Sequence, residues 1–189
     1  VEKPNFSDLA VAAGCGLPIP AANCLLPGTL KITGPAVDQA AVQHYLRILL
    51  PRARDIGIQT LVFGSGAARQ IPEGFPKAKA YGQIVDFLRM AGGLAELHGI
   101  TLAVEHLNRA ECNIINSLAE AVEYARAVNF PAVRVLADAY HFWSENESLQ
   151  NLQDALPYLH HVHVADKEGR VPPGESGPRA AARGPLSPG

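Results

Sequence analysis

Three side chains that can bind a divalent metal ion lie in apolar, β-branched runs. Glu105 ends the run TLAVE, Asp138 ends the run VRVLAD, and His163 lies in the run HVHVA. Such runs predict strands of a parallel sheet, whose carboxyl ends meet at one edge. Two carboxylates and an imidazole suit Mn²⁺, Mg²⁺ or Co²⁺, with coordination positions left open for substrate oxygens. Each residue could instead be a helix cap or a hydrogen-bonded core residue, so the residues alone leave both interpretations open.

The glycine-rich run FGSGAAR, from Phe63 to Arg69, is a second candidate for binding. Its backbone could cradle a phosphate, but the run matches neither the GxGxxG pattern nor the P-loop pattern. A tight turn between a strand and a helix is therefore the favoured interpretation.

The charge and hydropathy of the sequence argue against two classes of partner. Lys and Arg number 16 and Asp and Glu 18, for a net charge of −2 at pH 7, so no broad basic surface for nucleic acid is expected. No stretch approaches the roughly 18 consecutive apolar residues of a membrane span, and the N-terminal VEKPNFSDLA has no signal-peptide pattern. The three cysteines form no CxxC motif and fit a reducing compartment. We therefore expect a cytoplasmic chain that binds neither nucleic acid nor membranes.

The segments that must position these side chains alternate between short strands and longer helical patterns, as in the βα units of a parallel sheet. Strands are expected around residues 19–23, 60–63, 101–105, 133–138 and 161–165. Helices are expected from residue 38 onward, at 77–98, from 117 to about 128, and at 149–159. Asp38 and Ser117 are placed to cap helix starts, and Gly99 to cap a helix end. Pro51 is expected to kink or end its helix early.

The predicted fold class is α/β: a partial (β/α)8 TIM barrel with about five to six parallel strands and outer helices. The 189 residues are 48% hydrophobic, enough for a buried core. A complete barrel has about 250 residues, so eight strands are not expected here. Residues 1–175 are assigned to the barrel domain, and the Pro/Gly/Ala/Arg-rich residues 176–189 to a disordered tail.

The segments VEHLNRAECNIINSLAEAVEYA, VRVLADAYH and HVHVADKEGRVPPGE resemble the xylose isomerase-like TIM barrels, which include sugar isomerases and epimerases such as D-tagatose 3-epimerase and hydroxypyruvate isomerase. The Glu of that family's E-P-L-N-R motif binds the metal and moves a proton, which implies both roles for Glu105. His106 stands where the family has Pro. The L-x-D-x-x-H motif implies Asp138 as a metal ligand, and the second His of the H-x-H motif implies His163.

The resemblance also implies substrate contacts by Glu111, His141 and Arg170. The loop that carries Arg170 is one residue longer than the common pattern. Glu111 could instead be a solvated carboxylate, His141 a strand-end cap and Arg170 a surface charge.

By resemblance, the expected function is a divalent-metal-dependent sugar or sugar phosphate isomerase or epimerase that transfers protons through an enediolate, on a small sugar or hydroxy-carbonyl substrate. The family supplies a second catalytic Glu from its last strand, and no segment after Glu175 offers it. The alternative is a catalytically inactive, truncated member that retains weak metal or sugar binding. An open sheet edge would favour homo-oligomers. Cleavage of abasic DNA, as in the more distant endonuclease IV, would need more histidines and a basic surface.

Overall fold

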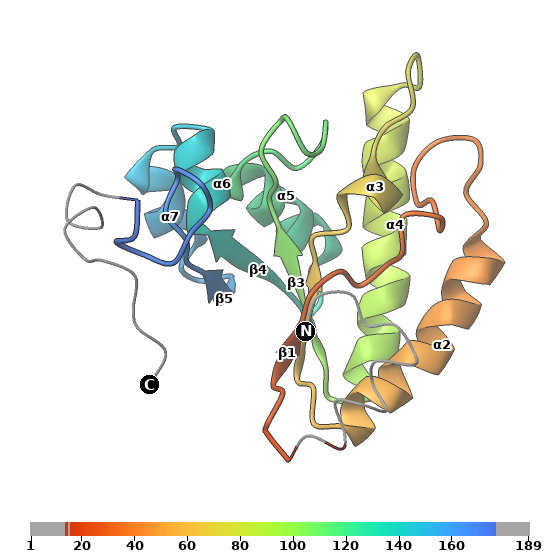
Figure 1. Cartoon of the computed structure of the whole chain (residues 1–189). Coiled ribbons are helices and arrows are strands. Elements are labelled where there is room, and N and C mark those ends of the chain that lie inside the picture. Colours follow the sequence, from red (N-terminus) through yellow and green to blue (C-terminus); the bar gives the residue numbers. More distant parts are fainter. Residues whose placement is uncertain (1–13, 15, 177–189) are drawn as a thin grey trace.

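Five parallel strands in sequential order form one curled sheet in the computed structural model, which describes residues 14 and 16–176 (Figure 1). The strands are β1 (Ala21–Ala22), β2 (Thr60–Phe63), β3 (Thr101–Glu105), β4 (Val133–Asp138) and β5 (Leu159–His163). Each neighbouring pair is parallel. The helices lie on the convex side of this sheet (Figure 1). The predicted α/β class and partial barrel are thus confirmed.

The helices that connect the strands are α2 (Gln39–Asp55), α3 (Gly66–Arg69), α4 (Lys77–Glu96), α5 (Leu118–Val128), α6 (Ala139–Ser144) and α7 (Leu149–Ala155). The carboxylate of Asp38 accepts a hydrogen bond from the N–H of Ala41, and the Ser117 hydroxyl accepts one from the N–H of Glu120, so both predicted N-caps are present. Among the described residues, no helix combines the length and apolar character needed to cross a bilayer.

The prediction that Pro51 kinks or ends its helix early is wrong about the end, because α2 runs through Pro51 to Asp55. Proline removes one backbone donor, which weakens a helix at that point. Here the flanking apolar side chains Leu49, Leu50 and Ala53 are fully buried. Their packing outweighs the local loss, as tertiary burial supplies most of the stability of helices in proteins.

The last strand also differs from its prediction. It occupies Leu159–His163 rather than 161–165, and the preceding helix α7 ends at Ala155. The register with β4 shifts between Val135 and Leu136, which leaves His160 as an extra residue in β5. His160 Nε2 lies 3.0 Å from Thr60 Oγ1 of β2, so the curl brings nonadjacent strands into contact.

Apolar side chains bury both faces of the sheet. The larger cluster joins strand residues such as Leu61 and Leu102 to Leu46 of α2 and Ile84 of α4. A smaller cluster on the other face consists of Val62, Ala103 and Leu136, all fully buried. Because side chains alternate across a strand, this second cluster lies inside the curl, below the carboxyl ends of β2, β3 and β4.

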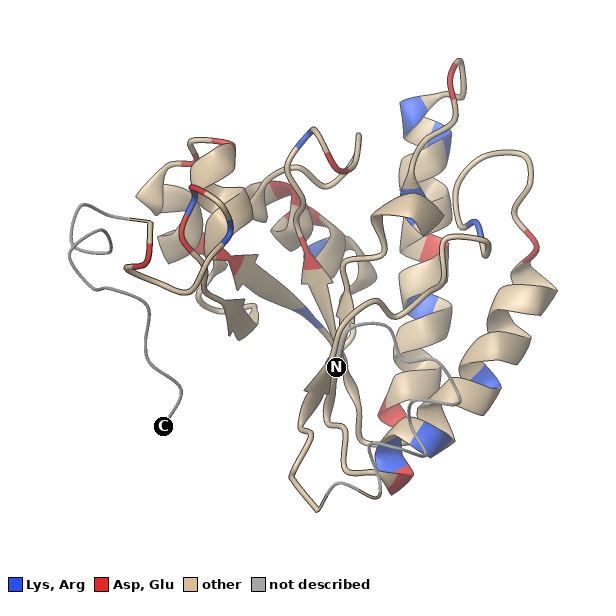
Figure 2. Cartoon of the chain, viewed as in Figure 1, with Lys and Arg blue, Asp and Glu red and all other residues tan. Residues whose placement is uncertain are grey.

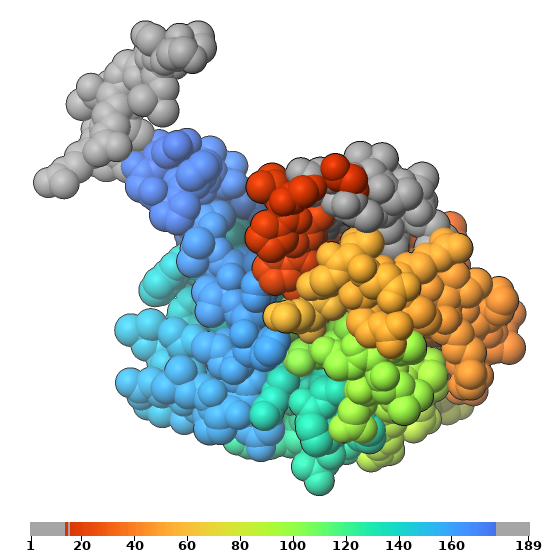
Figure 3. All heavy atoms as spheres, turned by 90° about the horizontal axis from the view of Figure 1, so that it is seen from below, coloured from red at the N-terminus to blue at the C-terminus, as the bar shows by residue number. Residues whose placement is uncertain are grey.

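Charged groups are interspersed over the helices rather than gathered along one of them (Figure 2). Acidic residues mark the carboxyl ends of β3 and β4, which is where Glu105 and Asp138 lie (Figure 2). Seen from below, the red residues around β1 lie beside the blue residues in and after β5 (Figure 3). Cys24 and Ala165 from these two segments line a common cavity, so the curl brings the first and last strands of the sheet to one site.

Candidate metal centre

Glu105, Asp138 and His163 are the last residues of β3, β4 and β5. Each offers one ligand atom, and the three atoms lie within 4.8 Å of one another. His163 Nδ1 lies 2.9 Å from Glu105 Oε1 and 3.4 Å from Asp138 Oδ2. Bonds from one ion to carboxylate and imidazole ligands are about 2.0–2.6 Å long, so a single ion can span this group. The convergence expected from their positions at strand ends is present.

Two local features orient the carboxylates. Asp138 also caps α6: its Oδ1 accepts the N–H of His141 at 3.1 Å, which leaves Oδ2 directed toward His163. Glu105 lies against Gly64, where a Cβ would come within 1.8 Å of Glu105 Oε2. Only glycine leaves room for the carboxylate in this position.

The three groups perturb one another electrostatically. Hydrogen bonds to Asp138 and Glu105 raise the pKa of His163 to about 9. Burial works to raise the pKa of Asp138. The hydrogen bonds that it accepts from His163 and from the backbone N–H of His141, together with the charge of His163, outweigh burial and hold that pKa at about 2. Asp138 is therefore an anion at neutral pH. A metal ion bound here would have to displace the proton of His163.

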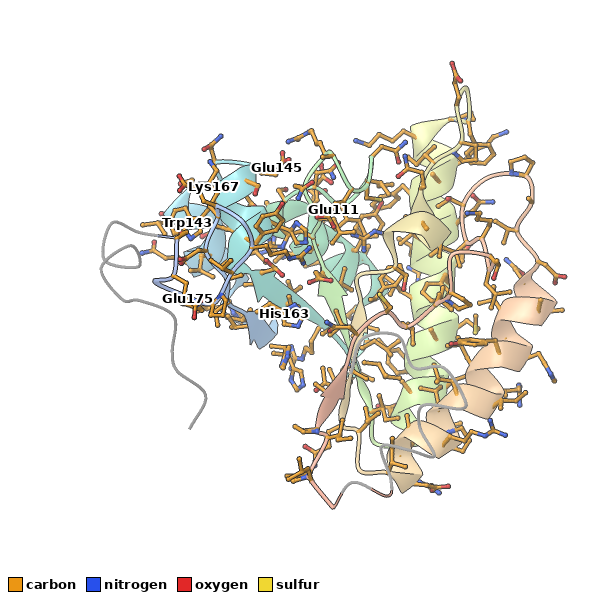
Figure 4. All side chains as sticks on the ribbon, in the orientation of Figure 1. Glu111, Trp143, Glu145, His163, Lys167 and Glu175 are labelled. Carbon is orange, nitrogen blue, oxygen red and sulfur yellow. The ribbon has the colours of Figure 1, made fainter. Side chains whose placement is uncertain are left out.

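A cavity of about 660 Å³ lies over these ligands, and its walls include Glu111 and Arg170. Glu111 and His163 come from separate segments of the chain, the one after β3 and the end of β5 (Figure 4). The Arg170 guanidinium lies near two carboxylates, with nitrogens 3.4 Å from Glu111 Oε1 and 3.7 Å from Asp138 Oδ2. Two of the three predicted substrate contacts therefore face the cavity.

His141, the third predicted substrate contact, is fully buried and lies beneath Arg170. Its Nδ1 accepts the N–H of Asn108 at 3.1 Å, and its Nε2 lies 3.5 Å from the Arg170 guanidinium. Burial, together with Arg170, lowers the pKa of His141 to about 4 despite the opposing charge of Asp138. The neutral ring that accepts at Nδ1 carries its proton on Nε2, on the side of Glu111 and Arg170.

Arg69 supports the site although no motif in the sequence predicted a role for it. Its fully buried guanidinium donates to the backbone carbonyls of Phe63 and Glu105, at 2.8 Å each, and thereby joins the carboxyl ends of β2 and β3. The run FGSGAAR accordingly forms a turn into the short helix α3. An arginine among small residues directly after a buried strand was the only signal for this role.

His106, at the position where the family has Pro, is also fully buried. Burial lowers its pKa to about 4 and raises the pKa of Glu147, whose Oε1 lies 3.3 Å from His106 Nε2. The imidazole is uncharged at neutral pH, so this contact is not an ion pair.

The curled parallel sheet is part of a TIM barrel, and its acidic and imidazole side chains lie at the carboxyl ends of the strands, where TIM-barrel enzymes have their active sites. The family described as xylose isomerase-like TIM barrel matches residues 5–182, and the chain belongs to it. A D-psicose 3-epimerase of Agrobacterium fabrum is 33% identical over 97 residues, which cover 51% of this chain and 34% of that protein. A 3-dehydro-D-guloside 4-epimerase of Escherichia coli is 36% identical over 92 residues, 48% of this chain and 35% of that protein. The chain thus matches about a third of the length of these relatives.

Solved structures agree with the fold. A D-psicose 3-epimerase crystallised in the presence of D-fructose superposes with a TM-score of 0.74 and 25% identity, covering 89% of this chain and 63% of that one. The 3-keto-D-glucoside 4-epimerase of E. coli superposes with a TM-score of 0.70 and 24% identity, over 84% of this chain and 62% of the epimerase chain. At that identity, the similarity to the 4-epimerase supports the fold alone.

Proposed function

We propose that this chain provides the metal ligands and one proton-transfer group of a divalent-metal-dependent sugar isomerase or epimerase that acts through an enediolate. The observation that carries the proposal is the convergence of Glu105, Asp138 and His163 within 4.8 Å at the carboxyl edge of the sheet. Ligands and catalytic groups of TIM barrels occupy this edge. The relatives named as sugar epimerases support a sugar, or sugar phosphate, as the substrate class.

The donor set fits the metal. Two carboxylate oxygens and one imidazole nitrogen suit Mn²⁺, Mg²⁺ or Co²⁺. Glu105, Asp138 and His163 would hold the ion, and Gly64 leaves the space that the Glu105 carboxylate needs. When bound, the ion supplies positive charge that stabilises the enediolate oxygens.

Glu105 is the proton carrier in this proposal, because its carboxylate faces the cavity where the carbon next to the sugar carbonyl would lie. Arg170 and Glu111 would bind sugar hydroxyls from the cavity wall, and the N–H of His141 Nε2 lies 4.0 Å from the Glu111 carboxylate. The cavity, at about 660 Å³, is of the size that small-molecule sites have. Inversion at a carbon needs a second proton carrier on the opposite face, and among the described residues we assign only Glu105 to this work.

The substrate, the cellular compartment and the oligomeric state of the chain stay predictions. The substrate is a small sugar or hydroxy-carbonyl compound, the chain acts in the cytoplasm, and its open sheet edge favours homo-oligomers. Val162 and Val164, in and just after the edge strand β5, are 50% and 65% exposed, which supports association at that edge.

Solvent exchange tests the proposal more directly than net epimerisation, because it requires only one proton carrier. The chain is incubated with Mn²⁺ and D-psicose, D-fructose or D-tagatose in D₂O, and deuterium next to the carbonyl is followed by NMR. We expect Mn²⁺-dependent exchange that falls by about 10²–10⁴ in Glu105→Gln. Glu73→Gln, which changes an exposed loop carboxylate, should exchange normally. Exchange that is equal in Glu105→Gln, or independent of metal, would reject the proposal.

A further inference from the structure

The loop that follows β5 reaches the proposed metal centre through one side chain, Arg170. Its guanidinium lies 3.4 Å from Glu111 Oε1, 3.5 Å from His141 Nε2 and 3.7 Å from Asp138 Oδ2. It also lies 4.6 Å from the centre of the Tyr140 ring, within the range of a cation–π contact. The placement of this cation over the cavity depends on the conformation of the loop.

That conformation is one that an unanchored loop would rarely adopt. Arg170 has a φ of 51°, in the left-handed region that side chains other than glycine disfavour, and Gly169 precedes it with a φ of 73°. Residues 167–170 are exposed, so packing does little to hold them. Such a segment has many alternative conformations that would carry Arg170 into solvent.

Asp166 anchors the loop at its start. Its carboxylate accepts hydrogen bonds from the backbone N–H groups of Gly174 and Ser176, at 2.9 Å each, and from the Ser176 hydroxyl at 2.8 Å. The backbone N–H of Asp166 donates to the carbonyl of Val171 at 2.9 Å. Hydrogen bonds from Ser176 and Gly174 lower the pKa of Asp166, so it is charged at neutral pH. Asp166 thereby ties the loop's two ends together, with Arg170 between them.

Ser176, the first residue of the predicted tail, takes part in this anchor. Residues 177–189 lie outside the described residues. The loop makes a second, longer contact at Lys167, whose Nζ lies 3.4 Å from Asn146 Oδ1. Lys167 and Glu175 lie on the two arms of the loop that leaves β5 at His163 (Figure 4).

We propose that Asp166 is a positioning residue for the sugar site: its carboxylate holds residues 166–176 so that Arg170 stays against Glu111 and Asp138. This inference rests on the proposed function, in which Arg170 contacts the sugar. The hydrogen bonds of the Asp166 carboxylate are confined to its own loop, so removing it should weaken sugar binding while the three metal ligands keep their places.

The test compares Asp166→Ala and Asp166→Asn with the matched control Glu168→Ala. Glu168 is an exposed carboxylate on the same loop, and within the described part of the chain it has no hydrogen bond or ion pair. Three quantities are measured: the rate of tryptic cleavage after Lys167 and Arg170, the Mn²⁺ affinity, and the affinity for D-psicose and D-fructose with Mn²⁺ present. Mass spectrometry identifies the bond that is cut.

For Asp166→Ala we expect cleavage in the loop to become at least about fivefold faster and ketose affinity to fall about tenfold, with Mn²⁺ affinity unchanged within about threefold. Asp166→Asn keeps one acceptor oxygen and should be intermediate. In an Arg170→Met background, Asp166→Ala should add no further loss of ketose affinity, because the two residues act through one contact.

Two results would overturn the inference: cleavage and ketose affinity that match Glu168→Ala, or an equal further loss when Arg170 is already Met. If the unaltered chain binds no ketose at all, the proposed function fails, and the cleavage rates alone then decide whether Asp166 holds the loop.

Discussion

The α-carbon of Gly64 lies so close to the carboxylate of Glu105 that a Cβ on Gly64 would come within 1.8 Å of Oε2. The two residues directly follow the Phe63 and Val104 pair of β2 and β3, so the strand register itself brings them together. The proposed metal ligand Glu105 thus owes its space to a missing side chain directly after the neighbouring strand. Glycine at this position serves a close approach rather than a turn.

Gly64→Ala should therefore displace the Glu105 carboxylate and weaken Mn²⁺ binding by about 10- to 100-fold, the range seen when the support of a metal ligand is removed. Calorimetric titration measures the change. Gly82→Ala is the matched control, because a Cβ at Gly82 of α4 meets nothing within 4 Å. We expect that control to bind metal normally and to gain about 0.5–1 kcal/mol in free energy of unfolding. Normal Mn²⁺ affinity in Gly64→Ala would contradict this account of the site.

The pH dependence of metal binding should follow His163. Its pKa of about 9 in the folded chain lies above the ordinary value of 6.5, because Asp138 and Glu105 hydrogen-bond its protonated form. Mn²⁺ must displace that proton, so apparent affinity should rise between pH 6.5 and 9, with about one proton released per ion. Titration in buffers of different ionisation enthalpy measures the release. An affinity that stays flat over this range would mean that His163 is not a ligand.

In the presence of a chelator the same group should act on stability in the opposite sense. A raised folded-state pKa means that protonated His163 stabilises the folded chain. This contribution should be fully present below about pH 6.5 and lost as the pH rises through 9. Urea unfolding of the unaltered chain and of His163→Gln, in EDTA, tests it: the difference between them should shrink toward pH 9.

Arg69→Met should destabilise the fold. The substitution leaves the carbonyls of Phe63 and Glu105 without the two donors that now hold them, and each unsatisfied buried group costs about 1–3 kcal/mol. We expect a loss of roughly 2–5 kcal/mol in free energy of unfolding. Arg89→Met is the control, since Arg89 is exposed and its contacts to Ala127 and Asp86 lie at the surface, where a change within about 0.5 kcal/mol is usual. Equal urea midpoints for the two variants would show that Arg69 does not join the strands.

Much of the fold and the centre of the site can be predicted from the sequence. The runs ending in Glu105 and Asp138 form the predicted strands over the predicted residues, because a short β-branched run between helical patterns carries its own signal. Since parallel strands end at one edge, the meeting of these carboxylates with His163 followed from the same pattern. Where a boundary depended on packing elsewhere, as at Pro51 and at the start of β5, the local pattern failed.

The sequence by itself determined the parallel α/β class, the helix caps at Asp38 and Ser117, and the residues that could bind a metal, since each depends on neighbours a few positions away. Only the tertiary structure decided which residues support them. Gly64 and Glu105 are 41 positions apart, yet they lie in van der Waals contact. Arg69 of α3 donates to the carbonyl of Glu105 at the end of β3. Contacts of this kind arise only when strands pair and the sheet curls, so no local sequence pattern predicts them.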